Sequence, residues 1–182
     1  NSSNCGYDVP PGLNTVSNPA RSPQVTAVGS TSREDGELAS HSTWGPTDQP
    51  DTINPNGYPL IKPQVVAPGV EIPSAYAPGD RDYALMSGTS MAAPHVAGLV
   101  ALMWEAGSCL VGDYAATETL LQESATPISY DSGNGDEGPD MVPNHAAGWG
   151  EINAAEAVRR AEVHCNGGYL DGYVLNADDQ NP

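Results

Sequence analysis

The stretch Ser87-Gly-Thr-Ser-Met-Ala-Ala-Pro-His-Val-Ala-Gly98 decides how the rest of the chain is interpreted. It opens a run that stays apolar to Ala106, and a helix over residues 90–106 would be apolar nearly all round, so we expect it to be buried. A Gly-Thr-Ser turn at its start places the Ser90 hydroxyl beside unpaired backbone N–H groups and the positive end of the helix dipole. That position suits the stabilisation of an oxyanion, although Ser90 alone could equally be a helix N-cap.

Other elements lie on both sides of this helix. We expect short strands over residues 25–29, 65–67 and 83–86, and helices over residues 113–125 and 153–163. Asp113 and Asn153 are the expected N-caps of the two later helices. In the last helix Glu156 falls in the first turn, and Arg159 and Arg160, expected towards its C-terminal end, should pair with it on a solvated face. Short strands that alternate with helices indicate an α/β layer fold.

Charge limits the possible partners. The chain has 6 Lys and Arg residues against 23 Asp and Glu residues, a formal net charge of -17. So negative a surface repels phosphate backbones and anionic lipid, which argues against a nucleic-acid or membrane partner. The longest apolar stretches are also well short of the roughly 20 residues that cross a bilayer. The composition suits a soluble protein that is secreted or tolerates salt.

The eleven residues Gly88–Gly98 closely resemble the nucleophile motif of the subtilisin-like serine proteases, the subtilases. The same resemblance continues, in the family's order, in other parts of the chain. These parts are residues 27–29, 39–46, 62–69 and 148–157. Residues 109–118 are most similar to the bacillopeptidase F-like branch of the family. The chain therefore resembles the C-terminal half of a subtilase catalytic domain.

The resemblance implies a subtilisin-like α/β fold with a parallel central sheet flanked by helices. Residues 1–165 would be the C-terminal part of the catalytic domain, and residues 166–182 a polar tail. It also implies a secreted serine endopeptidase that acts on proteins or peptides through an acyl-enzyme on Ser90 and requires no cofactor for its chemistry.

Two of the three catalytic residues of the family have no counterpart in this chain. The subtilase order is Asp, His and then Ser, and neither an Asp-Thr/Ser-Gly nor a His-Gly-Thr motif precedes Ser90. The base and its orienting acid would come from an upstream half of the domain, without which the chain should be inactive and fold poorly. The alternative is a non-catalytic binding or structural module derived from a subtilase, although nothing in the nucleophile segment is degenerate.

Further site residues follow from the resemblance. The family's oxyanion hole combines the Ser backbone N–H with an Asn side chain; Asn1 fits that place, and Asn4 is a weaker candidate. The wall of the substrate pocket should lie in a turn that matches the family's Tyr-Pro-Gly turn, although a plain surface turn is the alternative. That turn consists of Ser17, Asn18, Pro19 and Ala20.

The four histidines are not expected to act as the base. His95 lies on the same helix as Ser90, and the motif makes it a buried structural residue. His41 stands where the family usually has an aromatic or apolar residue, so we expect it to pack. His145 is expected in a loop and His164 at the surface.

Two features bear on structural calcium and disulfides. The acidic loop Asp131–Asp140 offers oxygen ligands for calcium, although such loops are usually only solvated. Gln64 stands where the family commonly has Asp, which removes one possible cation ligand. The resemblance also suggests a disulfide between Cys109 and Cys165, with Cys5 left for an upstream partner. Pro94 is expected near the first turn of its helix, where its missing N–H costs least.

Overall fold

A computed structural model describes most of the chain, in several segments. The described residues are 15–32, 36–46, 61–130, 141–167, 169–170 and 173–174. Asn1, Asn4, Cys5 and the acidic loop Asp131–Asp140 therefore lie outside the described residues.

A small parallel sheet lies at the centre of the described fold. Strand β1 (Val28–Thr31) pairs in parallel with β2 (Val65–Pro68), with Val28 opposite Val65. The backbone at Glu151 extends this pairing on the other side of β2 through a parallel bridge to Val66. The first strand begins three residues later than expected, because the Ala27 N–H donates to the side chain of Gln64.

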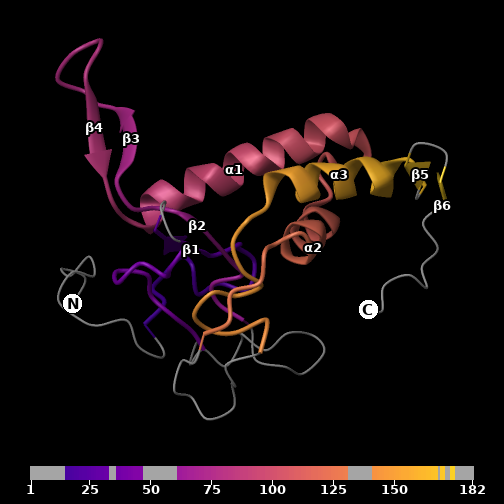
Figure 1. Cartoon of the computed structure of the whole chain (residues 1–182), viewed down its shortest axis with the longest axis horizontal. Helices are drawn as coiled ribbons and strands as arrows, with labels where there is room; N and C mark the ends of the chain where they lie inside the picture. The colour runs from indigo at the N-terminus through magenta and orange to yellow at the C-terminus, as the bar shows by residue number, and fades with distance from the viewer. Residues whose placement is uncertain are drawn as a thin grey trace.

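The third expected strand exists but belongs to a different sheet. Strand β4 (Tyr83–Met86) has the expected bounds, yet it pairs antiparallel with β3 (Ile72–Ala75), which we did not predict. The two strands form a hairpin that projects from the body of the molecule (Figure 1). Its apolar side chains are open to solvent; Tyr83 is 76% exposed and Leu85 is 64% exposed.

Three helices pack beside the parallel sheet, and the first of them lies directly on its strands. They are α1 (Thr89–Ala106), α2 (Tyr114–Glu123) and α3 (Ala154–Cys165), with a short 3-10 turn, η1 (Ser108–Leu110), after α1. Both predicted caps are confirmed: Asp113 accepts a hydrogen bond from Ala116 N–H, and Asn153 accepts one from Glu156 N–H. No helix in the described ranges is long and apolar enough to span a membrane.

The hydrophobic core lies between the sheet and these helices. Its buried residues are Val65, Ala67, Ala92, Val96, Leu99, Met103, Leu110, Leu121, Ala157 and Ala161. In Figure 1, α1 and α3 run side by side while α2 lies below them. The α/β architecture with helices on a parallel sheet agrees with the expected fold class.

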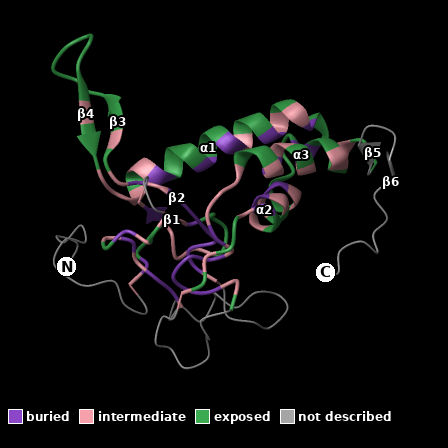
Figure 2. Cartoon of the chain, viewed as in Figure 1, coloured by how far each residue is buried: buried purple, intermediate pink, exposed green. Residues whose placement is uncertain are grey.

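Helix α1 is only half buried, which corrects our expectation that it is enclosed. One stripe, Ala92, Val96, Leu99 and Met103, faces the core. The opposite side is exposed along much of the helix (Figure 2), and Leu102 is 55% exposed. The apolar sequence therefore predicted the helix correctly. Its prediction that the outer face is buried was wrong.

The C-terminal ends of α1 and α3 are held together at two points. The predicted disulfide between Cys109 and Cys165 is confirmed. Gly107, which ends α1, lies so close to α3 that a Cβ there would be 2.6 Å from the Ala161 carbonyl oxygen. This close approach, rather than a special backbone angle, explains the glycine.

Helix α3 also carries the predicted ion pairs. Glu156 binds Arg159 and Arg160, and Arg160 reaches Glu123 on α2. The arginines lie in the middle of α3 rather than towards its end, because the helix runs on to Cys165. Hydrogen bonding by Arg159 lowers the pKa of Glu156 to about 2.

The tail after residue 165 contains a short antiparallel pair, β5 (Tyr169–Leu170) and β6 (Tyr173–Val174). The division of the chain into a domain at residues 1–165 and a polar tail stays a prediction.

Substituting Gly107 tests the close packing of α1 on α3. Gly107→Ala should lower the free energy of unfolding by about 1–3 kcal/mol, because the new methyl group meets backbone atoms that cannot move aside. Gly98→Ala is the matched control, since nothing lies within 4 Å of a Cβ at Gly98. Helix propensity should make that change neutral or stabilising by up to ~1 kcal/mol. Equal effects of the two variants in urea denaturation would contradict the packing argument.

Removing the disulfide should destabilise the fold. A cross-link between residues separated by 56 positions restricts the unfolded chain and contributes about 4 kcal/mol in the loop-entropy description. We therefore expect Cys109→Ser/Cys165→Ser to unfold at a clearly lower urea concentration than the parent chain. Non-reducing peptide mapping of the parent gives the direct check: recovery of both cysteines as thiols would disprove the pairing.

Candidate active site

Ser90 is the second residue of α1, and the turn before it is anchored to the parallel sheet. Gly88 N–H donates to the Gly69 carbonyl at 2.7 Å, and Gly69 N–H donates to the Thr31 carbonyl at 3.0 Å. Thr31 ends β1, and Gly69 follows β2 directly. Ser90 therefore lies at the carboxyl ends of the parallel strands, where α/β proteins commonly place their functional sites.

Two glycines make this anchoring possible. Gly88 has a φ of 155°, which side-chain-bearing residues rarely adopt. At Gly69 a Cβ would be 2.2 Å from Ser30 Oγ and 2.7 Å from the Gly88 carbonyl oxygen. A larger residue would clash at Gly69 and would be strained at Gly88, so these glycines determine where Ser90 lies.

The start of α1 differs from that of the other helices, since it has no side-chain cap. Gly88 occupies the N-cap position without a capping hydrogen bond, and the first turn contains no acidic residue. Helices α2 and α3 both have a side-chain oxygen over their first N–H groups. The exposed Ser90 hydroxyl thus lies beside backbone donors that no cap from the described residues occupies, and the helix dipole favours negative charge there.

Pro94 lies one step further along α1 than expected. It is the sixth residue of the helix, inside it rather than in the first turn. Because proline has no N–H, the Ser90 carbonyl lacks its usual helical donor four residues later. The chain therefore has an interruption in the helical hydrogen bonds directly behind Ser90.

The histidines are distributed around the fold, and none of the hydrogen bonds among the described residues joins one to Ser90. His95 is exposed, which corrects the prediction of a buried residue, and its Nδ1 lies 2.9 Å from the Met91 carbonyl oxygen. His41 is half-buried and lies 3.1 Å from Ser30 Oγ; burial lowers its pKa. His145 is a buried loop residue, and His164 is exposed.

The other predicted site residues stay predictions. Asn1 and Asn4 lie outside the described residues. The candidate substrate wall forms a turn in which Arg21 N–H donates to the Ser17 carbonyl, and Ser22 N–H donates to the Pro19 carbonyl. Ser17, Asn18 and Pro19 are exposed, while Ala20 is half-buried.

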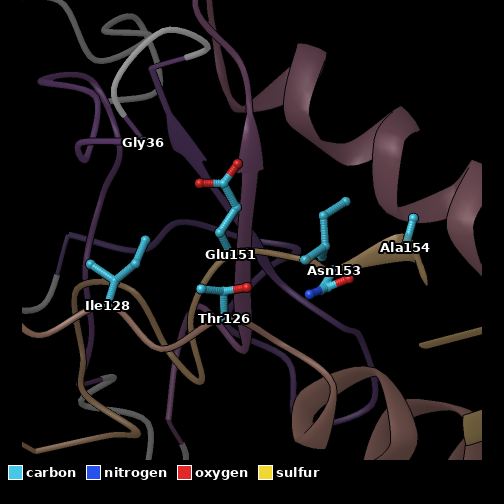
Figure 3. Close-up of a pocket in the computed structure, with 7 residues that line it drawn as sticks. Gly36, Thr126, Ile128, Glu151, Asn153 and Ala154 are labelled. Carbon is cyan, nitrogen blue, oxygen red and sulfur yellow. The ribbon is translucent and has the colours of Figure 1, made fainter. Parts of the chain in front are cut away.

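A separate pocket contains a carboxylate that sequence reasoning missed. A cavity of about 510 Å³ is lined by Gly36, Thr126, Ile128, Glu151, Ile152, Asn153 and Ala154. Figure 3 shows the Glu151 side chain extending from the backbone segment beside β2. Desolvation raises the pKa of this half-buried carboxyl group. The sequence offered no signal that Glu151 lines a pocket, because residues 148–157 were interpreted only as the motif of the last helix.

Sequence reasoning also missed a polar cluster at the amino-terminal end of the parallel sheet, opposite the end where Ser90 lies. Lys62 is fully buried, and its Nζ donates to the Val25 carbonyl at 2.5 Å. The Gln64 amide donates to the same carbonyl and to Glu118 on α2. Burial lowers the pKa of the Lys62 ammonium to about 8, whereas the nearby Glu118 carboxylate acts in the opposite direction.

This cluster does not suit a bound calcium ion. Calcium takes six to eight oxygen ligands, whereas here a buried ammonium group and an amide N–H group already point at the available oxygens. Among the described ranges, no three His, Cys, Asp or Glu side chains are grouped so that they could hold a metal ion. The acidic loop predicted as a calcium candidate lies outside those ranges.

Comparison with known proteins gives consistent results. A sequence model of the subtilase family matches residues 1–150. Bacillopeptidase F of Bacillus subtilis is 35% identical over 175 residues, which cover 96% of this chain and 11% of that protein. Subtilisin-like protease 1 of Trichophyton rubrum is 37% identical over 75% of this chain and 23% of its own length. The chain thus spans between a tenth and a quarter of these two relatives.

Solved structures show the same likeness. The CspB protease of Clostridium perfringens superposes with a TM-score of 0.62 at 25% identity, over 82% of this chain and 29% of that one. The patellamide maturation protease PatA gives a TM-score of 0.55 at 26% identity, over 88% of this chain and 50% of that one. Together with the match to residues 1–150 and the fold described above, these likenesses establish that the chain belongs to the subtilase family.

Proposed function

We propose that this chain is the nucleophile-bearing part of a serine endopeptidase. Ser90 Oγ attacks the carbonyl carbon of a peptide bond after passing its proton to a histidine, and the amine product leaves as an acyl-enzyme forms. Water then hydrolyses that ester. The tetrahedral oxyanion accepts hydrogen bonds from the Ser90 N–H and from the Asn1 side chain. The substrate lies against residues 17–20.

The uncapped start of α1 is the observation that carries this proposal. A helix that needed Ser90 only for stability would gain from a capping side chain at the N-cap position, as α2 and α3 do. Gly88 instead leaves the first N–H groups without a side-chain acceptor. Donors that are already oriented towards the reacting atom cost no reorganisation when charge develops there.

The base and its orienting acid come from an upstream half of the same domain, outside these 182 residues. The exposed apolar side of α1 supports this part of the proposal, because Ser90 lies at its N-terminal end and an enclosed helix in the complete domain would bury that side. The Cys109–Cys165 disulfide supports a secreted protein, since such bonds persist in oxidising compartments.

Labelling with a fluorophosphonate tests the role of Ser90. In a protein that includes the upstream half, we expect one adduct that maps to Ser90. The 182-residue chain alone should react at least about 10⁴-fold more slowly, because it lacks the base that activates the hydroxyl.

Two variants sharpen this measurement in the longer protein. Ser90→Ala should abolish the adduct, while Ser108→Ala, at the far end of α1, should leave it unchanged. If the longer protein carries no adduct and cleaves no peptide, the chain is the non-catalytic module considered above. An adduct on another serine would instead assign the nucleophile elsewhere.

Steady-state kinetics of the longer protein test the second oxyanion donor. Asn1→Ala should reduce kcat by about 10²–10³-fold with little change in KM, because the lost hydrogen bond forms only in the transition state. Asn4→Ala is the matched control and should have a much smaller effect. The reverse ranking of the two variants would assign the donor to Asn4.

A further inference from the structure

We propose that the ammonium group of Lys62 is a resident cation at the amino-terminal end of the parallel sheet, so that this end of the sheet needs no bound calcium. Lys62 is the only lysine in the chain, and it is fully buried. A buried charge is tolerated only where it is paired and hydrogen-bonded. Lys62 has a hydrogen-bond acceptor in the Val25 carbonyl and a nearby opposite charge in Glu118.

Three segments that are distant in sequence meet at this ammonium group. Residues 25–27 lead into β1, residues 62–64 lead into β2, and Glu118 belongs to α2. Lys62 Nζ donates to the Val25 carbonyl, and Glu118 is the charged group that faces it. A cation bonded to a backbone carbonyl and near a carboxylate takes the place that a bound metal ion could otherwise occupy.

Gln64 provides the remaining hydrogen bonds of this cluster. Its Oε1 accepts a hydrogen bond from Ala27 N–H at 2.7 Å, and its Nε2 donates to Glu118 at 2.9 Å. Aspartate at this position could offer oxygens to a metal ion, but it could not donate a hydrogen bond to Glu118. The amide and the ammonium therefore belong to one arrangement that uses N–H donors where a metal site would use oxygen ligands.

An open cavity lies beside this cluster, so calcium is not kept out by limited access. A cavity of about 290 Å³ borders the cluster, and its lining includes Val25, Thr26 and Glu118. An ion could approach Glu118 from this cavity. It would meet a positive charge and a carboxylate oxygen that already accepts hydrogen bonds from Gln64 and from the Thr26 hydroxyl. The donor set, rather than a barrier, excludes the metal.

Converting the cluster into a metal site tests the proposal. In a protein that includes the upstream half, Lys62→Met/Gln64→Asp removes the internal cation and adds a carboxylate beside Glu118. Its Tm should rise by about 3–5 °C more than that of the parent when chelator is replaced by about 10 mM CaCl₂, a concentration well above the dissociation constants of extracellular calcium sites. Lys62→Met alone is the matched control and should gain little, because the Gln64 amide still covers the oxygens.

Two outcomes of the melting experiment would overturn the proposal. If the double variant gains no calcium response, this end of the sheet is not a cation site and Lys62 does not stand in for a metal. If the parent already shows a calcium response that Glu118→Gln removes, calcium binds there beside the lysine. A calcium response that Glu118→Gln leaves unchanged belongs to another part of the chain and is compatible with the proposal.

The unmodified chain provides a measurement that does not depend on whether the variants fold. With a single lysine, isotope labelling gives one set of side-chain NMR signals, and their titration midpoint should lie near the pKa of about 8. Addition of CaCl₂ should leave the signals and the midpoint in place. A calcium-dependent shift of either would show that the metal competes with the ammonium, which the proposal forbids.

Discussion

The hydrogen bond from Gly88 N–H to the Gly69 carbonyl is the contact on which the candidate site depends. It joins the start of α1 to the end of β2 at a point where neither residue has a side chain, and the Gly69 N–H in turn reaches the end of β1. The position of Ser90 therefore follows from backbone atoms alone. A helix start held in this way keeps its N–H groups oriented without a capping side chain, and this distinguishes α1 from α2 and α3.

The two sides of α1 differ in burial. The side with Val96 and Leu99 packs on the sheet and gives the helix its position. The other side is equally apolar but exposed, and Ser90 lies at its N-terminal end. Under the proposed function, a segment that covers the outer side of α1 also lies next to Ser90, where the base would be needed.

Local signals in the sequence predicted much of this fold. Asp113 and Asn153 marked helix starts because a capping side chain interacts with backbone only three residues away. The strand at Tyr83–Met86 was predicted with the right bounds, but its partner was not, since Ile72–Ala75 carries no clear strand pattern. The burial of Lys62 could not be predicted, because its partners come from residues 25 and 118, and only the folded chain brings them together. The position of Ser90 on its helix was predictable, whereas the exposure of His95 depends on what covers α1.

The disulfide between Cys109 and Cys165 has a consequence for resistance to proteolysis. The two cysteines enclose α2 and the first eleven residues of α3, together with the chain between them. A single cut at any peptide bond inside that loop leaves both pieces in one covalent molecule. Helix α1 would then keep its neighbour α3 even after the backbone is broken, so a cut there need not separate the parts of the core.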